Sequence, residues 1–189
     1  RGTWFGAASW ALAGTAKNAS EVSGGEANSA DFDNLYVGWR YGDPESGQFE
    51  VAGGRYPYQI ANGFLLSDGY ADGGSRGAVW TNPRTAWAPG ARIQYLYSGQ
   101  RVDRFCRERD ERPESNSDTR LSGINSQWPA ANSSWTLGAS YMAFKANELE
   151  PQLDGADTWN LRLYTRPWSI PLTIDAEWAY EDNGDALDA

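Results

Sequence analysis

The sequence predicts an all-β fold, an antiparallel up-and-down transmembrane β-barrel to which this chain contributes about nine strands. Three observations predict this fold. Apolar and polar residues alternate along most of the chain, the links between the alternating segments are by turns short and long, and aromatic residues gather near the segment ends. We expect residues 1–189 to form a single β-barrel domain that is incomplete at both ends.

The alternating segments are the expected strands. The clearest pair is a hairpin of residues 35–41 and 48–56, joined by a tight turn at 43–47. Charges fall on both parities of residues 101–110, so this segment is equally compatible with a strand and with a charged loop. The other expected strands are residues 3–12, 91–97, 119–128, 135–143, 159–166 and 172–181.

The links between these segments alternate in length. The short links are residues 43–47, 98–100, 129–132 and 169–171, whereas the longer links are residues 14–31, 57–87, 111–118 and 145–157. Barrels of the outer membrane have short periplasmic turns and longer external loops, and strands of about 9–11 residues that cross the lipid layer. A soluble sandwich has no reason to keep its short links at one end.

Aromatic residues support the same fold. On the apolar parity, Trp4 and Trp10 are six residues apart, as are Trp135 and Tyr141, which corresponds to roughly 20 Å along a strand. Rings near both ends of a strand form the two interfacial bands of a barrel. In the alternative interpretation, these rings fill the core of a soluble β-sandwich.

Composition excludes several functional classes. The chain has a net charge of -9 and no histidine, which argues against nucleic acid as a partner and removes the commonest metal ligand and general base. The mean hydropathy is -0.65, and no run of apolar residues is long enough for a transmembrane helix. Cys106 is the single cysteine, so it cannot form a disulfide within the chain. We expect no metal and no cofactor.

Neither end of the chain looks like a natural terminus. The first residues lack the apolar segment of a signal peptide, and the last residues read as the start of a loop without a closing strand. We therefore expect the chain to be the interior part of a longer protein.

Several segments resemble one family of bacterial proteins. The stretch GRYPYQIANGFLLSDG, followed by RGAVW and PRTAW, spans about residues 55–87, and DTRLSGIN, SSWTLGASYMAF and DTWNLRLYTRPW come later. Together they resemble the alginate-export-like outer-membrane porins of Gram-negative bacteria. The resemblance implies a barrel of about eighteen strands. It also implies passive export or diffusion of an anionic polysaccharide or of small anions, with lipid and solute as the partners.

The polar parity of the expected strands supplies candidate pore-lining residues. Arginine is always charged and offers two parallel hydrogen bonds to a carboxylate or phosphate, so it suits an anion-conducting lumen. The opposing interpretation is that these arginines pair with nearby carboxylates and only fill the lumen. The candidates are Arg40, Glu50, Arg55, Arg92, Arg162, Arg166, Asp175 and Glu177.

Residues 57–87 are the candidate constriction loop. Phe64, Leu65 and Leu66 give this loop an apolar anchor, so we expect it to fold inward and narrow the pore. Residues 68–74 only faintly resemble a calcium-binding loop, because their spacing fails the EF-hand pattern. The candidate constriction residues are Phe64, Leu65, Asp68, Asp72, Arg76 and Arg84.

Two soluble proteins are the alternatives to a channel. Asp175 and Glu177 lie two residues apart on one strand among many tryptophans, which suggests a glycoside hydrolase. The carboxylates of such enzymes normally face each other across a cleft, about 5–9.5 Å apart, and neighbours on one strand seldom do. A carbohydrate-binding module is the other alternative, since tryptophan stacks on sugars. We expect no catalysis.

Overall fold

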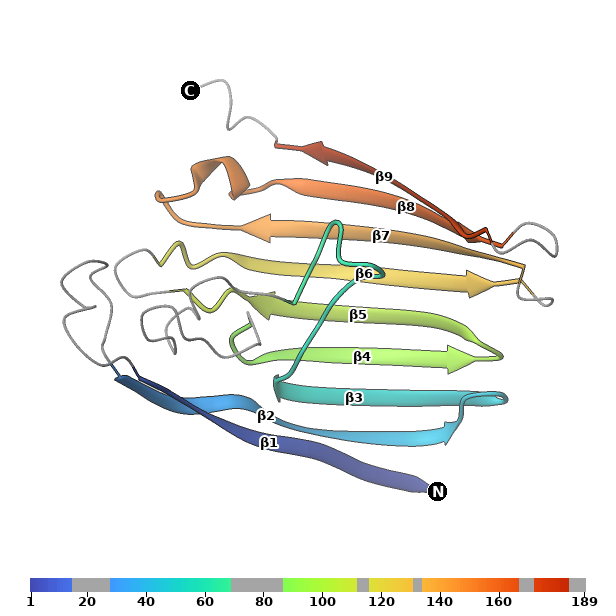
Figure 1. Ribbon diagram of the computed structural model, residues 1–189, viewed down its shortest axis with the longest axis horizontal. Helices are drawn as coiled ribbons and strands as arrows, with labels where there is room; N and C mark the ends of the chain where they lie inside the picture. The colour runs from blue at the N-terminus through green and yellow to red at the C-terminus, as the bar shows by residue number, and fades with distance from the viewer. Residues whose placement is uncertain (15–27, 69–86, 112–115, 131–133, 167–171, 184–189) are drawn as a thin grey trace.

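A computed structural model of the chain shows one antiparallel sheet of nine strands in its described part. It describes residues 1–14, 28–68, 87–111, 116–130, 134–166 and 172–183. The strands lie side by side in sequence order, each hydrogen-bonded to the next, so the topology is up-and-down (Figure 1). The sheet is not closed, because β1 and β9 do not pair with each other. The all-β, up-and-down arrangement predicted from the alternation is therefore confirmed.

The strand bounds follow the alternating segments. The strands are β1 (Gly2–Gly14), β2 (Asn28–Asp43), β3 (Gly47–Arg55), β4 (Gly90–Tyr97), β5 (Gln100–Glu108), β6 (Arg120–Pro129), β7 (Trp135–Lys145), β8 (Asp157–Thr165) and β9 (Ile174–Asp182). The strand ends that the short links join lie at one end of the sheet, and those that the long links join lie at the other (Figure 1). Among the described residues, no helical segment has the length and hydrophobicity of a transmembrane helix.

Several predicted bounds were wrong. The link expected at residues 169–171 is longer, since β8 ends at Thr165 and β9 begins at Ile174. The link expected at residues 14–31 is shorter, since β1 continues to Gly14 and β2 already begins at Asn28. Residues 28–34 are mostly polar, yet they pair with β1, where Phe32 lies opposite Trp10, with a register shift beside Ser9. The sequence was equally compatible with a strand and with a charged loop at residues 101–110. In the structure most of this segment belongs to β5, which pairs along its length with both β4 and β6.

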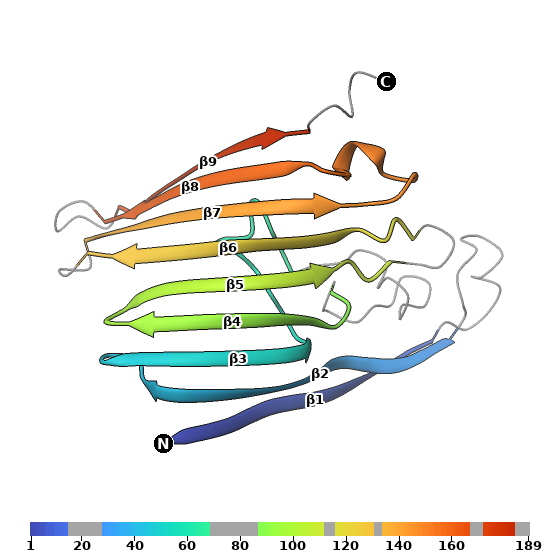
Figure 2. The ribbon, with the colours of Figure 1, turned by 180° about the vertical axis from the view of Figure 1, so that it is seen from behind.

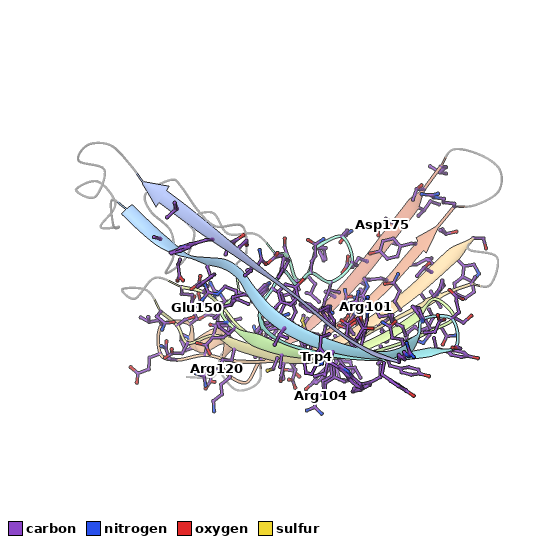
Figure 3. All side chains as sticks on the ribbon, turned by 90° about the horizontal axis from the view of Figure 1, so that it is seen from below. Trp4, Arg101, Arg104, Arg120, Glu150 and Asp175 are labelled. Atoms are coloured by element: carbon purple, nitrogen blue, oxygen red, sulfur yellow. The ribbon has the colours of Figure 1, made fainter. Side chains whose placement is uncertain are left out.

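The sheet is twisted and curved into a trough. Figure 3 views it from below, with the strands at its two sides rising above the middle of the sheet. Each strand turns alternate side chains to the convex and to the concave face. Arg101 and Arg104, three residues apart on β5, point to opposite sides, with Arg104 on the convex face. Residues that are paired across neighbouring strands point to the same face, so the convex and concave faces continue across the whole sheet.

The convex face is apolar. Large hydrophobic side chains on this face remain exposed, with aromatic residues near both strand ends. Two of the aromatic pairs pack ring to ring: Trp10 with Phe32 at 5.6 Å and Tyr141 with Trp159 at 4.5 Å between ring centres. The exposed members of the convex face are Trp4, Trp10, Leu12, Phe32, Leu35, Val37, Tyr41, Phe49, Val51, Ile93, Tyr95, Tyr97, Val102, Ile124, Trp128, Trp135, Leu137, Trp159, Leu161, Leu163, Ile174, Trp178 and Tyr180.

Residues 56–68, named here the inner segment, cross the concave face. They leave β3 and pass over the neighbouring strands, in front of the sheet in Figure 1 and behind it in Figure 2. Tyr58, Ile60 and Leu66 of this segment are buried against Phe105 and Met142 of the sheet. The hydrophobic core of the described residues thus lies between the inner segment and the concave face.

Candidate functional site

The concave face brings together most of the predicted pore-lining residues. Arg40 lies directly across from Glu50, and Arg162 lies directly across from Glu177. By the same register, Arg92 on β4 and Asp175 on β9 face the same side. These side chains come from strands at both sides of the trough, so they surround one shared concavity.

Arg55 and Arg166 lie at strand ends instead. Arg55 is the last residue of β3, and its Nη1 is 3.7 Å from Oδ2 of Asp110. Gly54 has a φ of 121°, but the pairing of β3 with β2 runs through the glycine pair without a shift. Arg55 therefore sits at the rim of the sheet, at the end that carries the long links. Arg166 directly follows β8 at the opposite end and is exposed.

A chain of polar contacts, named here the inner polar network, runs across five strands of the concave face. Its members are Arg101, Asp103, Asn125, Ser140, Asn160, Arg162 and Glu177. Asp103 is 0% exposed and accepts hydrogen bonds from Arg101 Nε at 2.6 Å and from Asn125 Nδ2 at 3.2 Å. Most of its polar groups have partners, which offsets the cost of their burial, although Glu177 Oε2 has no hydrogen-bond partner among the described residues.

Arg162, on β8, donates hydrogen bonds to three side chains of this network. Its guanidinium donates to Ser140 Oγ at 2.7 Å, to Asn125 Oδ1 at 2.6 Å and to the side-chain oxygen of Asn160. It lies over Gly138, where an added Cβ would stand 2.7 Å from Arg162 Nε. Arg162 is only 4% exposed, so its charge holds the sheet together and is not free to meet a solute.

The arginines differ in how available their charge is. Arg92 forms a salt bridge with Glu50, as the opposing interpretation of the sequence expects. Arg40 is exposed, and its Cζ lies 5.8 Å from the ring centre of Phe5, which is within the range of a cation–π contact. Arg40 and Arg166 are thus the candidate arginines that water reaches.

Tyr58 fastens the inner segment to the network. Its hydroxyl donates to Asp103 Oδ2 at 2.5 Å, and its ring lies 4.7 Å from the ring of Phe105. Trp87 Nε1 donates to the carbonyl oxygen of Tyr58 at 3.0 Å. Burial, together with the negative charge of Asp103, raises the pKa of the Tyr58 phenol, so this hydroxyl keeps its proton and remains a donor.

The tip of the inner segment reaches the far side of the trough. Asn62 Nδ2 donates to Asp175 Oδ2 of β9 at 3.0 Å, so the segment spans the concavity from β3 to β9. Ile60 and Leu66 are its buried apolar anchors, Leu65 is half-buried, and Phe64 is 69% exposed. Asp68 is half-buried at the end of the segment, whereas Asp72, Arg76 and Arg84 lie outside the described residues.

Comparison with known proteins gives no further guidance. No protein-family description, curated protein or solved structure matches the chain. The resemblance to alginate-export-like porins therefore rests on the sequence segments themselves and stays a prediction.

The two carboxylates proposed for a hydrolase are engaged separately. Asp175 accepts from Asn62 of the inner segment, whereas Glu177 Oε1 accepts from Asn160 Nδ2 at 2.9 Å. They lie two residues apart on β9 and do not face each other across a cleft. Within the described ranges, no group of histidine, cysteine and carboxylate side chains is arranged to hold a metal ion.

Sequence reasoning missed the centre of the network. Asp103 and Arg101 lie in the segment whose charges left strand and loop equally open, and Asn125, Ser140 and Asn160 carry no motif. One signal was present: Arg101, Asp103, Phe105 and Arg107 share one parity, which a strand turns to one face. Their contacts with other strands depend on register, which alternation alone does not give.

Proposed function

We propose that this sheet is part of the wall of a β-barrel channel in the bacterial outer membrane. One observation carries the proposal: the convex face exposes large apolar side chains, whereas the concave face carries charged and hydrogen-bonded ones. A barrel wall in a membrane needs this distribution, with lipid outside and water inside. Its aromatic residues near both strand ends match the interfacial bands of such a wall.

A soluble protein would cover such a face. Apolar patches on soluble monomers rarely exceed a few hundred Å², and larger ones mark interfaces with proteins or membranes. In the part of the chain that the structure describes, the inner segment packs on the concave face, and the large side chains of the convex face stay exposed. Lipid is the environment that suits an exposed, continuous apolar face of this kind.

Charged side chains also lie on the convex face. Glu108, Arg120 and Lys145 lie at the strand ends, next to the long links, and Arg120 forms a salt bridge with Glu108. Arg104, in the middle of β5, is exposed between Ile93 and Ile124 of the neighbouring strands. A lipid-facing arginine is costly at the middle of a bilayer but not near its surfaces. The long arginine stem can lie along the apolar surface and carry the charge toward the headgroups, so Arg104 is compatible with lipid contact.

In this proposal, further strands close the barrel. The described sheet is open, and an open sheet edge in lipid leaves backbone groups without hydrogen bonds. The family resemblance implies about eighteen strands, of which this chain would supply about half. The short turns would face the periplasm and the long loops the exterior.

The channel would conduct anionic saccharides or small anions by passive diffusion, without catalysis. The inner segment narrows the concavity, because it spans from β3 to Asp175 on β9. Arg40 and Arg166 are the candidate arginines exposed to water, so they would act on a passing anion. The buried Arg162 would instead support the wall.

A conductance measurement on the intact protein in planar bilayers tests this function. We expect channels whose chloride-to-potassium permeability ratio falls by at least about two- to threefold, the effect of one such charge on one ion, when Arg40→Gln and Arg166→Gln are combined. A single charge about 8 Å from an ion in water contributes about 0.5 kcal/mol. Arg104→Gln, on the convex face, should leave the ratio unchanged. An unaltered ratio in the double variant would remove the arginine role, and no conductance would contradict the channel.

A further inference from the structure

Unpaired hydrogen-bond donors gather at the base of the inner segment. In the described structure, the Tyr56 hydroxyl, Arg92 Nε and all three side-chain nitrogens of Arg107 are buried without a hydrogen-bond partner. Arg107 is 2% exposed and Tyr56 is 4% exposed, so water does not reach them from outside. Buried polar groups in proteins almost always have partners, which makes a cluster of orphaned donors informative.

These donors occupy one small region. Arg107 Cζ lies 3.5 Å from the centre of the Tyr56 ring, and Arg92 Cζ lies 5.6 Å from the same centre. Arg92 and Arg107 come from β4 and β5 and point to the same concave face, where Tyr56 covers them. Gly90 makes room for Arg107, because an added Cβ would lie 3.1 Å from Arg107 Nη1.

The region also has an uncompensated positive charge. Arg92 pairs with Glu50, and Arg101 pairs with Asp103, but no carboxylate in the described residues pairs with Arg107. Its contacts with the Tyr56 and Tyr58 rings are cation–π contacts, which supply only about 0.5–2 kcal/mol each. The effective cost of burying one ion is several kcal/mol, so the aromatic rings alone do not offset it.

We infer that Tyr56, Arg92 and Arg107 form a binding site for a small monovalent anion, with chloride as the ligand. Tyr56, Arg92 and Arg107 all have donors without partners here, the Glu50 carboxylate is already paired with Arg92, and one negative charge balances the charge of Arg107. A doubly charged oxyanion would overcompensate the single charge of Arg107. A water molecule could accept hydrogen bonds here but would not neutralise the guanidinium.

The bound anion would fasten the inner segment to the sheet. Tyr56 is the first residue of the segment, whereas Arg92 and Arg107 belong to β4 and β5, so one ion would join three parts of the chain. This inference goes beyond the proposed channel, because it holds whether or not the convex face contacts lipid.

A crystal of the intact protein grown in sodium bromide gives the direct test. Bromide replaces chloride and is located by its anomalous scattering. We expect a peak within about 3.5 Å of Arg107 Nη atoms and of the Tyr56 hydroxyl. A water molecule or a carboxylate of the protein at this position would overturn the site. This measurement needs no variant, so it does not depend on how well a variant folds.

Thermal unfolding supplies a second test on the purified protein. In sodium chloride, compared with sodium gluconate of equal ionic strength, we expect higher stability, and each tenfold rise in chloride above its Kd should lower the unfolding constant tenfold. Arg107→Met should abolish this difference. Arg104→Met, on the same strand but the opposite face, should retain it. Equal stability of the native protein in both salts would contradict the site.

Discussion

Leu161→Arg is expected to lower the stability of the membrane-inserted protein by about 2–4 kcal/mol, the cost of an arginine at the middle of a lipid-facing strand. Leu161 occupies the centre of β8, points to the convex face and is 56% exposed. Its neighbours across the sheet are Ala139 and Trp178, neither of which offers a counter-charge. Urea unfolding of the protein folded into phospholipid vesicles measures the change.

Ala179→Arg is the matched control for Leu161→Arg. Ala179 lies on the neighbouring strand, opposite Asn160, and is exposed on the concave face. If that face borders water, a new arginine there should change stability by less than about 1 kcal/mol, as ordinary surface substitutions do. Equal effects of the two variants would contradict the assignment of lipid and water to the two faces.

Asp103→Ala is expected to cost about 3–5 kcal/mol, because it leaves a charged partner without compensation in a buried site. Asp103 is fully buried and accepts from Arg101, Asn125 and Tyr58, so its loss orphans donors on three elements. The inner segment should also detach from the sheet, since the Tyr58 hydroxyl loses its acceptor. Unfolding in urea gives the stability, and limited proteolysis reports release of the segment.

Asp175→Ala is the control for this second prediction. Asp175 is exposed and accepts a hydrogen bond from Asn62 at the tip of the inner segment. Its removal should cost no more than about 1 kcal/mol. If Asp103→Ala were as mild as Asp175→Ala, the inner polar network would not be the main attachment of the segment.

The faces of the sheet could be predicted from the sequence because side-chain direction in a strand has a period of two. Leu35, Val37 and Tyr41 alternate with polar or small residues, and the structure turns them to one face. The short turns were equally readable, since Pro44 and Gly47 mark the hairpin between β2 and β3. Long-range information was not needed for either feature.

The inner polar network could not be predicted without long-range information. Asp103 meets Tyr58 of the inner segment, which lies 45 residues earlier in the chain, and no local pattern predicts that contact. The apolar anchors of the inner segment were only partly predicted. Leu66 is buried as its hydrophobicity suggests, but Phe64 points away because the turn between Ile60 and Leu66 sends it outward.

The central claim is that lipid covers the convex face and water fills the concave one. Spin labels on single cysteines along β9 test it most directly, in a Cys106→Ser background and in lipid vesicles. With Ala176→Cys and Trp178→Cys, on the convex face, we expect collisions mainly with oxygen, which dissolves in lipid. With Ala179→Cys and Glu181→Cys, on the concave face, collisions should be mainly with a water-soluble nickel complex. The same accessibility at all four positions would contradict the claim.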